Sequence, residues 1–223
     1  MIRTDSEETE NELDESLKVV LVGESGVGKT SIINQFAKGV FNQDLMSTNG
    51  AMFTTIKKEF KDSNGRSKLI SFEIWDTAGQ EKYRSLAKMF FKEASVGLII
   101  YDITSLKSFE EIKKYWMALV RENAPKNLIM YIVGNKSDLI GKEAVKEETA
   151  REYAKSENVN FYLTSAKDRI GIDELFNEIG KIYLNEFINS EENKERILRK
   201  NEVTKVNKES SQEDENQKKG CCG

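Results

Sequence analysis

The sequence predicts an α/β fold, in which a six-stranded and mostly parallel sheet is covered by helices on both faces. Six short apolar runs, each of the kind that forms a strand, alternate with segments of helical periodicity along the 223 residues. Asn64-Gly65 separates two of the runs and is typical of a hairpin turn, so we expect one antiparallel strand. Hydrophobic residues make up 38% of the chain, which is enough for the core of one domain.

The expected strands, in order, are LKVVLVG (17–23), FTTIKKEF (53–60), SKLISFEIW (67–75), VGLIIYDI (96–103), NLIMYIVG (127–134) and NVNFYLT (158–164). The fourth and fifth are continuous apolar runs, which are typical of strands buried on both faces. The segment KTSIINQFAKG predicts a helix that ends at Gly39. Helical spacing predicts two more helices, one through Phe109, Ile112, Trp116 and Leu119 and one through Ile172, Leu175, Phe176, Ile179 and Tyr183.

Composition divides the chain into three parts and excludes several classes of chemistry. Residues 1–16 hold seven acids and one base, and residues 188–223 are mostly polar, so we expect a disordered N-terminus and a flexible tail around a folded domain at 17–187. No histidine is present, which excludes a Ser-His-Asp triad and a His-ligated metal. The net charge of −4 argues against nucleic-acid binding, and no apolar run is long enough to span a membrane.

A phosphate-binding motif follows the first expected strand. Residues 23–30, GESGVGKT, fit the pattern G-x-x-x-x-G-K-S/T, whose glycines let backbone N–H groups surround phosphates at the start of a helix. Lys29 supplies a charge for the terminal phosphates, and Thr30 offers a hydroxyl to Mg²⁺. The alternative is an ordinary glycine-rich turn, and the motif alone does not distinguish ATP from GTP. The nucleotide-binding candidates here are Gly23, Ser25, Gly26, Val27, Gly28, Lys29, Thr30 and Ser31.

A second motif, WDTAGQ (75–80), follows the third expected strand. Asp76 at the end of that strand is a candidate to hold Mg²⁺ through water, and the Gly79 N–H is a candidate to approach a γ-phosphate. Gln80 is the candidate to orient the attacking water. A lone D-x-x-G is usually an ordinary turn, but its position after the phosphate-binding motif and a hairpin favours the functional interpretation.

Two further motifs, GNKSD (134–138) and TSAK (164–167), are candidates to select the base. Taken alone, the first is more often an exposed polar turn, and the second is a weak signal. The Asp138 carboxylate can accept two hydrogen bonds from guanine, whereas adenine would leave it unpaired in a buried site. Asn135 and Lys136 are expected to support the base and to tie this loop back to the phosphate-binding loop. Small residues after the sixth strand allow the Ala166 N–H to reach the guanine carbonyl, with Ser165 and Lys167 as neighbouring candidates.

The four motifs, each at the carboxyl end of a strand, are jointly specific, and the chain resembles the Rab family of Ras-superfamily small GTPases over about residues 17–187. The resemblance lies in WDTAGQEKYRSLAKMFFKEA, VGLIIYDIT, GNKSDL, SAK and the final CCG. The pieces STNGAMF and YRSLAKMFF are most similar to the early-endosomal Rab group. The resemblance implies a P-loop NTPase G domain that binds GTP or GDP with Mg²⁺.

The resemblance also assigns residues that the motifs alone do not. It implies that Thr48 reaches Mg²⁺, that Phe41, beside Asn42, packs against the guanine, and that Gln80 is the catalytic glutamine. It further implies that Phe53, Trp75 and Phe90 form a hydrophobic triad for effectors, although core packing is the alternative for these three. The chain departs from the family at Asn49, where isoleucine is usual, and at Lys88, where proline is usual in the most similar group.

The implied function is a monomeric switch that converts GTP and water to GDP and phosphate slowly, because no arginine is placed to assist within the chain. The family implies an exchange factor, a GTPase-activating protein, a GDP dissociation inhibitor or escort protein, and effectors of vesicle transport. We expect the protein in the cytosol and on the cytoplasmic face of endosomal membranes. The alternatives are a binding module that holds nucleotide without turnover and an ATP-using enzyme, which residues 135–138 disfavour.

The C-terminal tail resembles a lipid-modified Rab terminus. Cys221 and Cys222 are the only cysteines, so neither a disulfide framework nor a zinc site is expected. A C-a-a-X box requires cysteine fourth from the end, where this chain has Gly220. A paired cysteine resembles the substrate of the Rab prenyl transferase and implies two geranylgeranyl chains; two free thiols are the alternative. The tail has no polybasic run to assist membrane binding.

Overall fold

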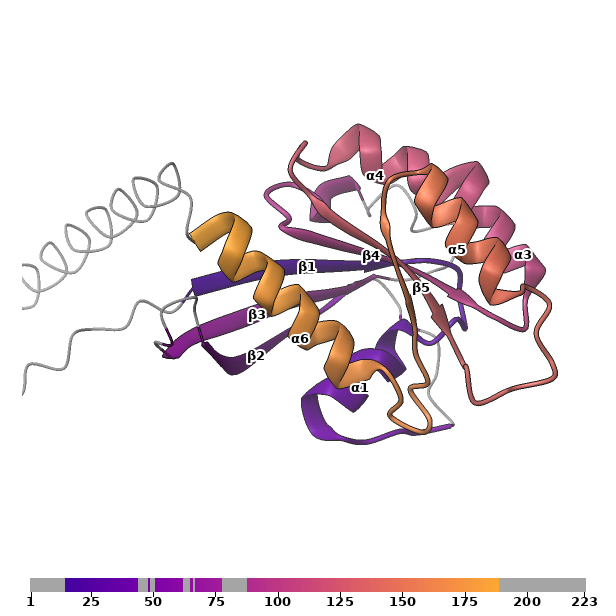
Figure 1. Ribbon diagram of the computed structural model, residues 1–223, viewed down its shortest axis with the longest axis horizontal. Coiled ribbons are helices and arrows are strands. Elements are labelled where there is room, and N and C mark those ends of the chain that lie inside the picture. The colour runs from indigo at the N-terminus through magenta and orange to yellow at the C-terminus, as the bar shows by residue number, and fades with distance from the viewer. Residues whose placement is uncertain are drawn as a thin grey trace, which may run out of the picture. The chain divides into compact units, whose positions relative to one another are not determined.

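The computed structural model describes residues 15–43, 48, 51–61, 65, 67–77 and 88–188. Six strands form one sheet in the order β2-β3-β1-β4-β5-β6, with helices on both faces (Figure 1). Among the strands that the structure describes, only β2 and β3 pair antiparallel, which confirms the predicted fold class. The strands are β1 (Glu15–Val22), β2 (Ala51–Lys61), β3 (Ser67–Thr77), β4 (Val96–Asp102), β5 (Ile129–Asn135) and β6 (Asn160–Leu163).

The first strand begins two residues earlier than expected. Glu15 and Ser16 pair in parallel register with Ile70 and Ser71 of β3, so the predicted start of the folded domain at residue 17 is corrected to 15. Strand pairing outweighs the acidic composition that placed these residues in the N-terminal segment. The remainder of that segment and the predicted tail at 189–223 lie outside the described residues.

The helices are α1 (Lys29–Lys38), α3 (Leu106–Glu111), α4 (Met117–Asn123), α5 (Glu147–Ser156) and α6 (Ile172–Tyr183), with π-helical turns η2 (Ile112–Trp116) and η3 (Leu184–Ile188). The helix that ends at Gly39 is confirmed, since the Gly39 N–H donates to the Gln35 carbonyl. The predicted helix through Phe109 and Leu119 is interrupted by η2. The chain divides into two compact units, Met1–Gly180 and Lys181–Gly223, and the described part of the second unit is Lys181–Ile188.

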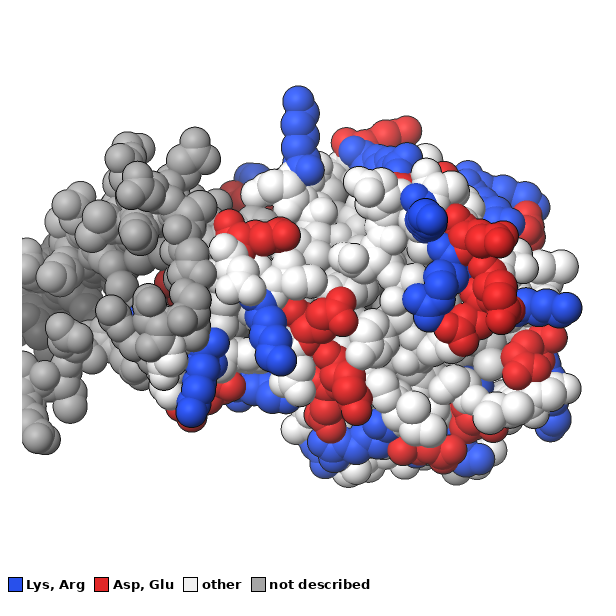
Figure 2. Space-filling view, in the orientation of Figure 1, with Lys and Arg blue, Asp and Glu red and all other residues white. Residues whose placement is uncertain are grey.

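On the face shown in Figure 2, charged side chains of the described residues are not segregated by sign. Lysine and arginine there lie beside aspartate and glutamate over the described elements. Pairs such as Lys113 with Glu110 and Arg151 with Glu147 are partly or fully exposed and connect neighbouring turns of single helices. Pairs of this kind contribute little to stability, so the fold depends on its apolar layers.

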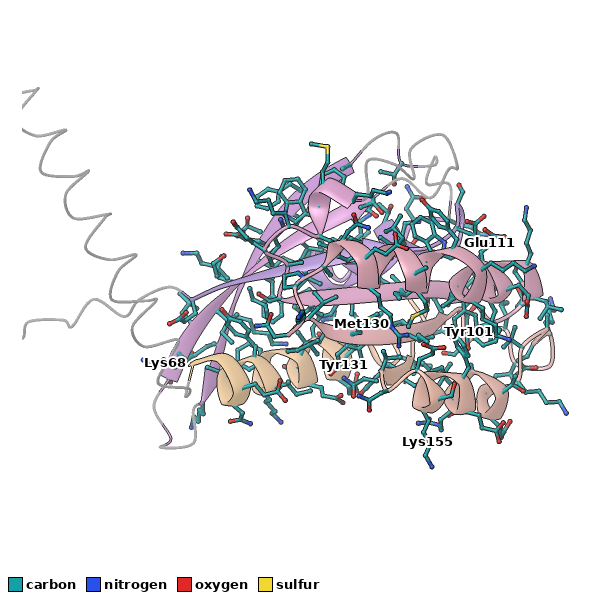
Figure 3. All side chains as sticks on the ribbon, turned by 90° about the horizontal axis from the view of Figure 1, so that it is seen from above. Lys68, Tyr101, Glu111, Met130, Tyr131 and Lys155 are labelled. Atoms are coloured by element: carbon teal, nitrogen blue, oxygen red, sulfur yellow. The ribbon has the colours of Figure 1, made fainter. Side chains whose placement is uncertain are left out.

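Side chains fill the space between the sheet and the helices on both faces (Figure 3). On one face, Phe36 of α1 stacks on Phe176 of α6 with ring centroids 3.8 Å apart, and Phe72 of β3 meets both rings edge-on. The Tyr131 hydroxyl of β5 also donates to the Glu178 carboxylate on α6 at 2.9 Å. These contacts hold α1, and with it the end of the phosphate-binding loop, against the sheet.

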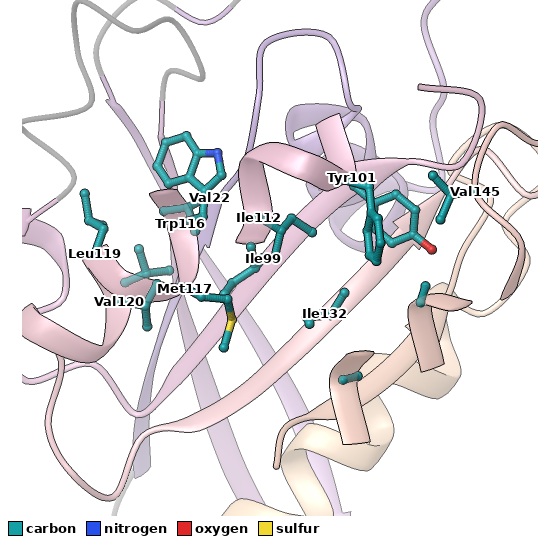
Figure 4. Packing of buried hydrophobic residues seen from close by; sticks show 14 of the residues in the cluster. Val22, Ile99, Tyr101, Ile112, Trp116, Met117, Leu119, Val120, Ile132 and Val145 are labelled. Carbon is teal, nitrogen blue, oxygen red and sulfur yellow. The ribbon is translucent and has the colours of Figure 1, made fainter. Parts of the chain in front are cut away.

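The second apolar layer lies between the sheet and α3, η2, α4 and α5 (Figure 4). Ile99, Ile112 and Trp116 are fully buried in it, together with Tyr101 near the carboxyl end of β4. Helix α5 contributes only Ala150 and Ala154 as fully buried residues, which explains why its sequence gives a weak apolar pattern. None of the described helices is long and apolar enough to cross a membrane.

We predict that Phe176→Ala lowers the free energy of unfolding by about 3–5 kcal/mol, because it removes the ring that stacks on Phe36 and leaves a cavity. Urea unfolding measures the change. The matched control is Ile140→Ala, since the Ile140 side chain is 83% exposed and its truncation is expected to change stability by less than about 0.5 kcal/mol. Equal effects of the two substitutions would contradict this assignment of the core.

Candidate functional site: a pocket at the carboxyl edge of the sheet

A pocket of about 360 Å³ lies beyond the carboxyl ends of the parallel strands, which is where open α/β sheets bind ligands. Its lining comes from the loops that follow β1, β5 and β6 and from the segment between α1 and β2. The lining residues are Ser25, Gly26, Gly28, Lys29, Thr30, Ser31, Phe41, Asn42, Gln43, Thr48, Asn135, Lys136, Asp138, Leu139, Ala166 and Lys167. Gln43 and Leu139 were not predicted, and adjacency to predicted residues is the only sequence signal for them.

The phosphate-binding loop requires glycine where other parts of the chain approach it closely. A Cβ on Gly23 would lie 2.1 Å from the Ile100 carbonyl oxygen of β4, and a Cβ on Gly28 would lie 2.2 Å from the Asn135 amide nitrogen. Both residues also have positive φ, at 142° and 98°, which side chains rarely adopt. The loop therefore lies in direct contact with the ends of β4 and β5, and α1 begins at Lys29 with its N-terminus at the pocket.

The Lys29 ammonium is buried inside this loop. It donates to the Gly23 carbonyl at 2.8 Å and to the Glu24 carbonyl at 2.9 Å, and the residue is 6% exposed. Burial lowers the pKa of Lys29 from 10.5 to about 8, and the nearby carboxylates of Asp76 and Glu24 oppose part of this shift. The site thus holds a cation in a poorly solvated position, where an anion interacts with it strongly.

Two hydroxyls and one carboxylate converge beside Lys29. The Thr30 Oγ1 hydroxyl donates to Asp76 Oδ2 at 2.5 Å and lies 2.8 Å from Thr48 Oγ1, which also donates to Asp76 Oδ2 at 3.3 Å. The other oxygen, Asp76 Oδ1, is buried and has no hydrogen-bond partner. Burial raises the pKa of Asp76, and the hydrogen bond from Thr30 and the charge of Lys29 oppose that rise.

This donor set fits Mg²⁺. All three groups offer hard oxygen atoms, and Mg²⁺ in nucleotide sites takes few protein ligands because phosphate oxygens and water complete its octahedral shell. The described residues contain no group of three or more His, Cys, Asp or Glu side chains that could form an all-protein metal site. The unpartnered Asp76 Oδ1 is available to a metal-bound water. A magnesium ion at this position would hold the nucleotide phosphates against Lys29.

The Asn135 side chain joins the phosphate-binding loop to both base-binding loops. Its amide nitrogen donates to the Val27 carbonyl at 2.8 Å, and its amide oxygen accepts from Thr164 Oγ1 and from the Ala166 N–H, both at 3.2 Å. Asn135 is 1% exposed, so each of these groups is out of water. The expectation that the loop after β5 is tied to the phosphate-binding loop is met by this residue.

The expected base-reading carboxylate lies at the pocket with one oxygen engaged. Asp138 Oδ1 accepts from Ser165 Oγ at 2.7 Å, and Asp138 Oδ2 lies 4.0 Å from the ammonium of Lys167. Ser165 thus positions the carboxylate and does not line the pocket itself. The Lys136 ammonium does not make the expected link to the phosphate-binding loop but pairs with Asp102 Oδ2 at 2.6 Å.

The three predicted effector-binding residues form a contiguous aromatic cluster away from the pocket. The Trp75 ring lies 5.0 Å from the Phe53 ring and 5.1 Å from the Phe90 ring. Phe53 is 50% exposed, whereas Trp75 and Phe90 are partly buried against the core, so core packing accounts for part of their placement. Five residues singled out in the sequence lie outside the described residues: Gly79, Gln80, Asn49, Cys221 and Cys222.

The fold and the pocket together define a P-loop nucleotide-binding domain. Residues 18–185 match the model of the Ras family. The chain is 41% identical over 165 residues to the Ras-related protein Rab-22A of Homo sapiens, covering 74% of this chain and 82% of that protein. The Ras-related protein Rab-22A of Canis lupus familiaris gives the same values. This chain therefore belongs to the Ras family and is a Rab small GTPase, an enzyme that binds GTP and GDP and hydrolyses GTP.

We predict that Lys29→Met stabilises the nucleotide-stripped protein by about 1–3 kcal/mol at pH 7 while it abolishes tight GDP binding. The protonated amine costs free energy in its buried position, and methionine removes that cost. Because the folded pKa of about 8 lies below the unfolded value of 10.5, the cost is complete below pH 8 and disappears as the pH rises toward 10.5.

The advantage of Lys29→Met over the wild type is therefore expected to narrow between pH 8 and pH 10.5 in urea unfolding. The matched control is Lys142→Met, because Lys142 is exposed and its replacement leaves no buried cation changed. A stability difference that does not vary with pH would contradict the proposed origin of the effect.

Proposed function

We propose that this Rab GTPase is a membrane-anchored switch that hydrolyses GTP slowly and recruits effectors for transport between endosomal membranes. The observation that carries the proposal is one pocket lined by the buried Lys29, by the two hydroxyls that bond Asp76, and by Asp138, with Asn135 linking the phosphate-binding loop to the loop after β6. Lys29 would face the terminal phosphates, and Asp138 would accept hydrogen bonds from guanine. Phe41 and Asn42 line the same pocket and would contact the nucleotide beside the base.

The contacts of Thr48 support a switching role for the segment between α1 and β2. Thr48 reaches across to Thr30 and Asp76, so the proposed Mg²⁺ site draws one donor from this segment and the others from α1 and β3. A γ-phosphate and its metal would strengthen this junction, and hydrolysis would weaken it. Gln80 would orient the attacking water, and Gly79 would contact the γ-phosphate.

We expect slow GTP hydrolysis because few positive charges are placed to stabilise the transition state. No arginine is among the residues that line the described part of the pocket, so Lys29 and Mg²⁺ would carry the charge of the transition state. We propose that a GTPase-activating protein supplies the missing arginine, that an exchange factor reloads the site, and that effectors bind the exposed Phe53 with Trp75 and Phe90. A GDP dissociation inhibitor would extract the GDP form from membranes.

Membrane attachment is proposed to depend on lipid rather than on surface charge. Cys221 and Cys222 would each receive a geranylgeranyl chain from the Rab prenyl transferase. The mixed charge seen in Figure 2 and in the tail sequence offers no basic surface for anionic lipid or nucleic acid on the face shown. We propose that the protein acts as a monomer, cycling between the cytosol and the cytoplasmic face of endosomal membranes.

We predict that the wild type prefers guanine to adenine nucleotides by about three orders of magnitude, because adenine cannot donate the two hydrogen bonds that guanine offers to the Asp138 carboxylate. Asp138→Asn should shift the preference toward xanthine nucleotides, whose additional carbonyl pairs with an amide. Competition of GDP, ADP and xanthosine diphosphate against labelled GDP measures both effects. Displacement by ADP at concentrations similar to GDP would contradict the assignment of this loop to the base.

We predict an intrinsic hydrolysis rate of about 10⁻⁴ to 10⁻² s⁻¹, as expected without an arginine in the chain's own site. Gln80→Leu should lower this rate and prolong the GTP state, because leucine cannot orient the attacking water. Single-turnover hydrolysis of preloaded GTP is the measurement, with Gln43→Leu as the control, since Gln43 lines the pocket but has no assigned role in the reaction. An unchanged rate in Gln80→Leu would remove Gln80 from its proposed role.

We predict that membrane-bound protein from its own cells carries two geranylgeranyl groups, as measured by intact mass. Each buried CH₂ contributes about 0.8 kcal/mol, and a single chain without basic support gives only reversible binding. Replacement of both Cys221 and Cys222 by serine should make the protein cytosolic and leave GDP affinity unchanged. Unmodified cysteines in the membrane fraction would refute this part of the proposal.

A further inference from the structure

A carboxylate outside all four nucleotide-binding motifs holds the lysine of the base-binding loop. Asp102 is the last residue of β4 and lies opposite Asn135 in the parallel register of β4 and β5. Its Oδ2 atom lies 2.6 Å from the Lys136 ammonium, a distance typical of a charge-assisted hydrogen bond. The Asp102 side chain is 12% exposed and the Lys136 side chain is 35% exposed, so the pair is only partly screened by water.

Asp102 is itself fixed from several directions. Its Oδ1 atom accepts from the Thr104 N–H at 2.8 Å and from the Thr104 hydroxyl at 2.7 Å, which leaves Oδ2 for Lys136. The backbone of Asp102 is held as well, since its N–H donates to the Ser108 hydroxyl and its carbonyl accepts from the Ser105 N–H. The carboxylate therefore presents one oxygen at a fixed position beside the start of the base-binding loop.

Lys136 needs such a support. Its φ of 69° is in the left-handed region, which residues with a side chain adopt infrequently. The residue lines the pocket, and a free lysine stem would have to give up its rotamer freedom each time a base packed on it. Because Asp102 holds the ammonium, the lysine side chain has already lost its rotamer freedom before the nucleotide binds. Binding then carries a smaller entropic cost, which favours high nucleotide affinity.

We propose that Asp102 is a positioning residue for nucleotide retention: through the Asp102–Lys136 ion pair it holds the lysine stem against the guanine base and slows nucleotide release. The inference rests on the proposed placement of the base at residues 135–138. Since a lysine stem contacts the face of the ring, its effect is independent of the exocyclic groups that Asp138 reads. Asp102 thus controls how long the nucleotide stays bound and not which base is selected.

The experiment measures release of labelled GDP from the full chain. Asp102→Asn keeps an oxygen for Thr104 and replaces only the charged oxygen that faces Lys136, and it should accelerate release about tenfold. Lys136→Met keeps most of the stem, removes the ammonium, and should accelerate release to a similar extent. The double variant should release GDP no more than about twofold faster than Lys136→Met, because the two residues act as one unit. Glu147→Gln, which removes an exposed carboxylate paired with Arg151, is the matched control and should not change release.

A second readout separates positioning from a general loss of structure. The preference for GDP over inosine diphosphate, which lacks the exocyclic amine, should stay within about twofold of the wild type in Asp102→Asn and should be lost in Asp138→Asn. A release rate in Asp102→Asn within twofold of the wild type, additive effects in the double variant, or a changed base preference would each overturn the inference. If Asp102→Asn does not fold, the inference is tested with Lys136→Met alone: a GDP release rate equal to that of the wild type would overturn it.

The two proposals fail in different ways. If the wild type does not retain GDP, or if Asp138→Asn leaves the base preference unaltered, then the proposed placement of the nucleotide is wrong. If both of those results support the placement and Asp102→Asn releases GDP at the wild-type rate, only the role of Asp102 is wrong.

Discussion

The buried amide of Asn135 is the interaction on which the rest of the site depends. One nitrogen and one oxygen connect Val27 in the phosphate-binding loop with Thr164 and Ala166 in the loop after β6. These segments are far apart in the sequence. The loops after β5 and β6 also meet through the Ser137 N–H, which donates to the Thr164 carbonyl, and through Ser165 with Asp138, and the Asn135 amide links the phosphate-binding loop to them. Hydrogen bonds from a buried amide are directional, and removing this one would leave the Val27 carbonyl and the Ala166 N–H without this partner. The distance between the phosphate-binding and base-binding halves of the pocket is thereby fixed.

The carboxyl edge of the sheet holds buried charged groups that destabilise the fold but are placed to bind the ligand. Lys29 is buried at a cost that its two carbonyl partners offset only in part, and burial also disfavours the charged form of Asp76. Phosphates and a magnesium ion would relieve both costs at once. The layers at α1 and α6 on one face and at α3 to α5 on the other supply the stability that this arrangement requires.

Much of this structure could be predicted from the sequence, because strands buried on both faces and glycine-rich loops have strong local patterns. The strands, α1 and most of the pocket lining were predicted in this way. Helix α5 was not predicted individually, since only Ala150 and Ala154 are fully buried on an otherwise polar segment. The pair of Lys136 and Asp102 was missed for a different reason: it joins residues 34 positions apart through the register of β4 and β5, and no local pattern contains that information.

The most direct test of this account is amide hydrogen exchange of Asn135→Ala in the presence of GDP, compared with the wild type and with Ser137→Ala. Ser137 lies in the same loop, and its buried hydroxyl has no hydrogen-bond partner, so its replacement preserves the link. The account predicts faster exchange in Asn135→Ala at both residues 25–31 and residues 164–167, with both regions protected in Ser137→Ala. Faster exchange confined to the loop after β5, with the phosphate-binding loop still protected, would contradict it.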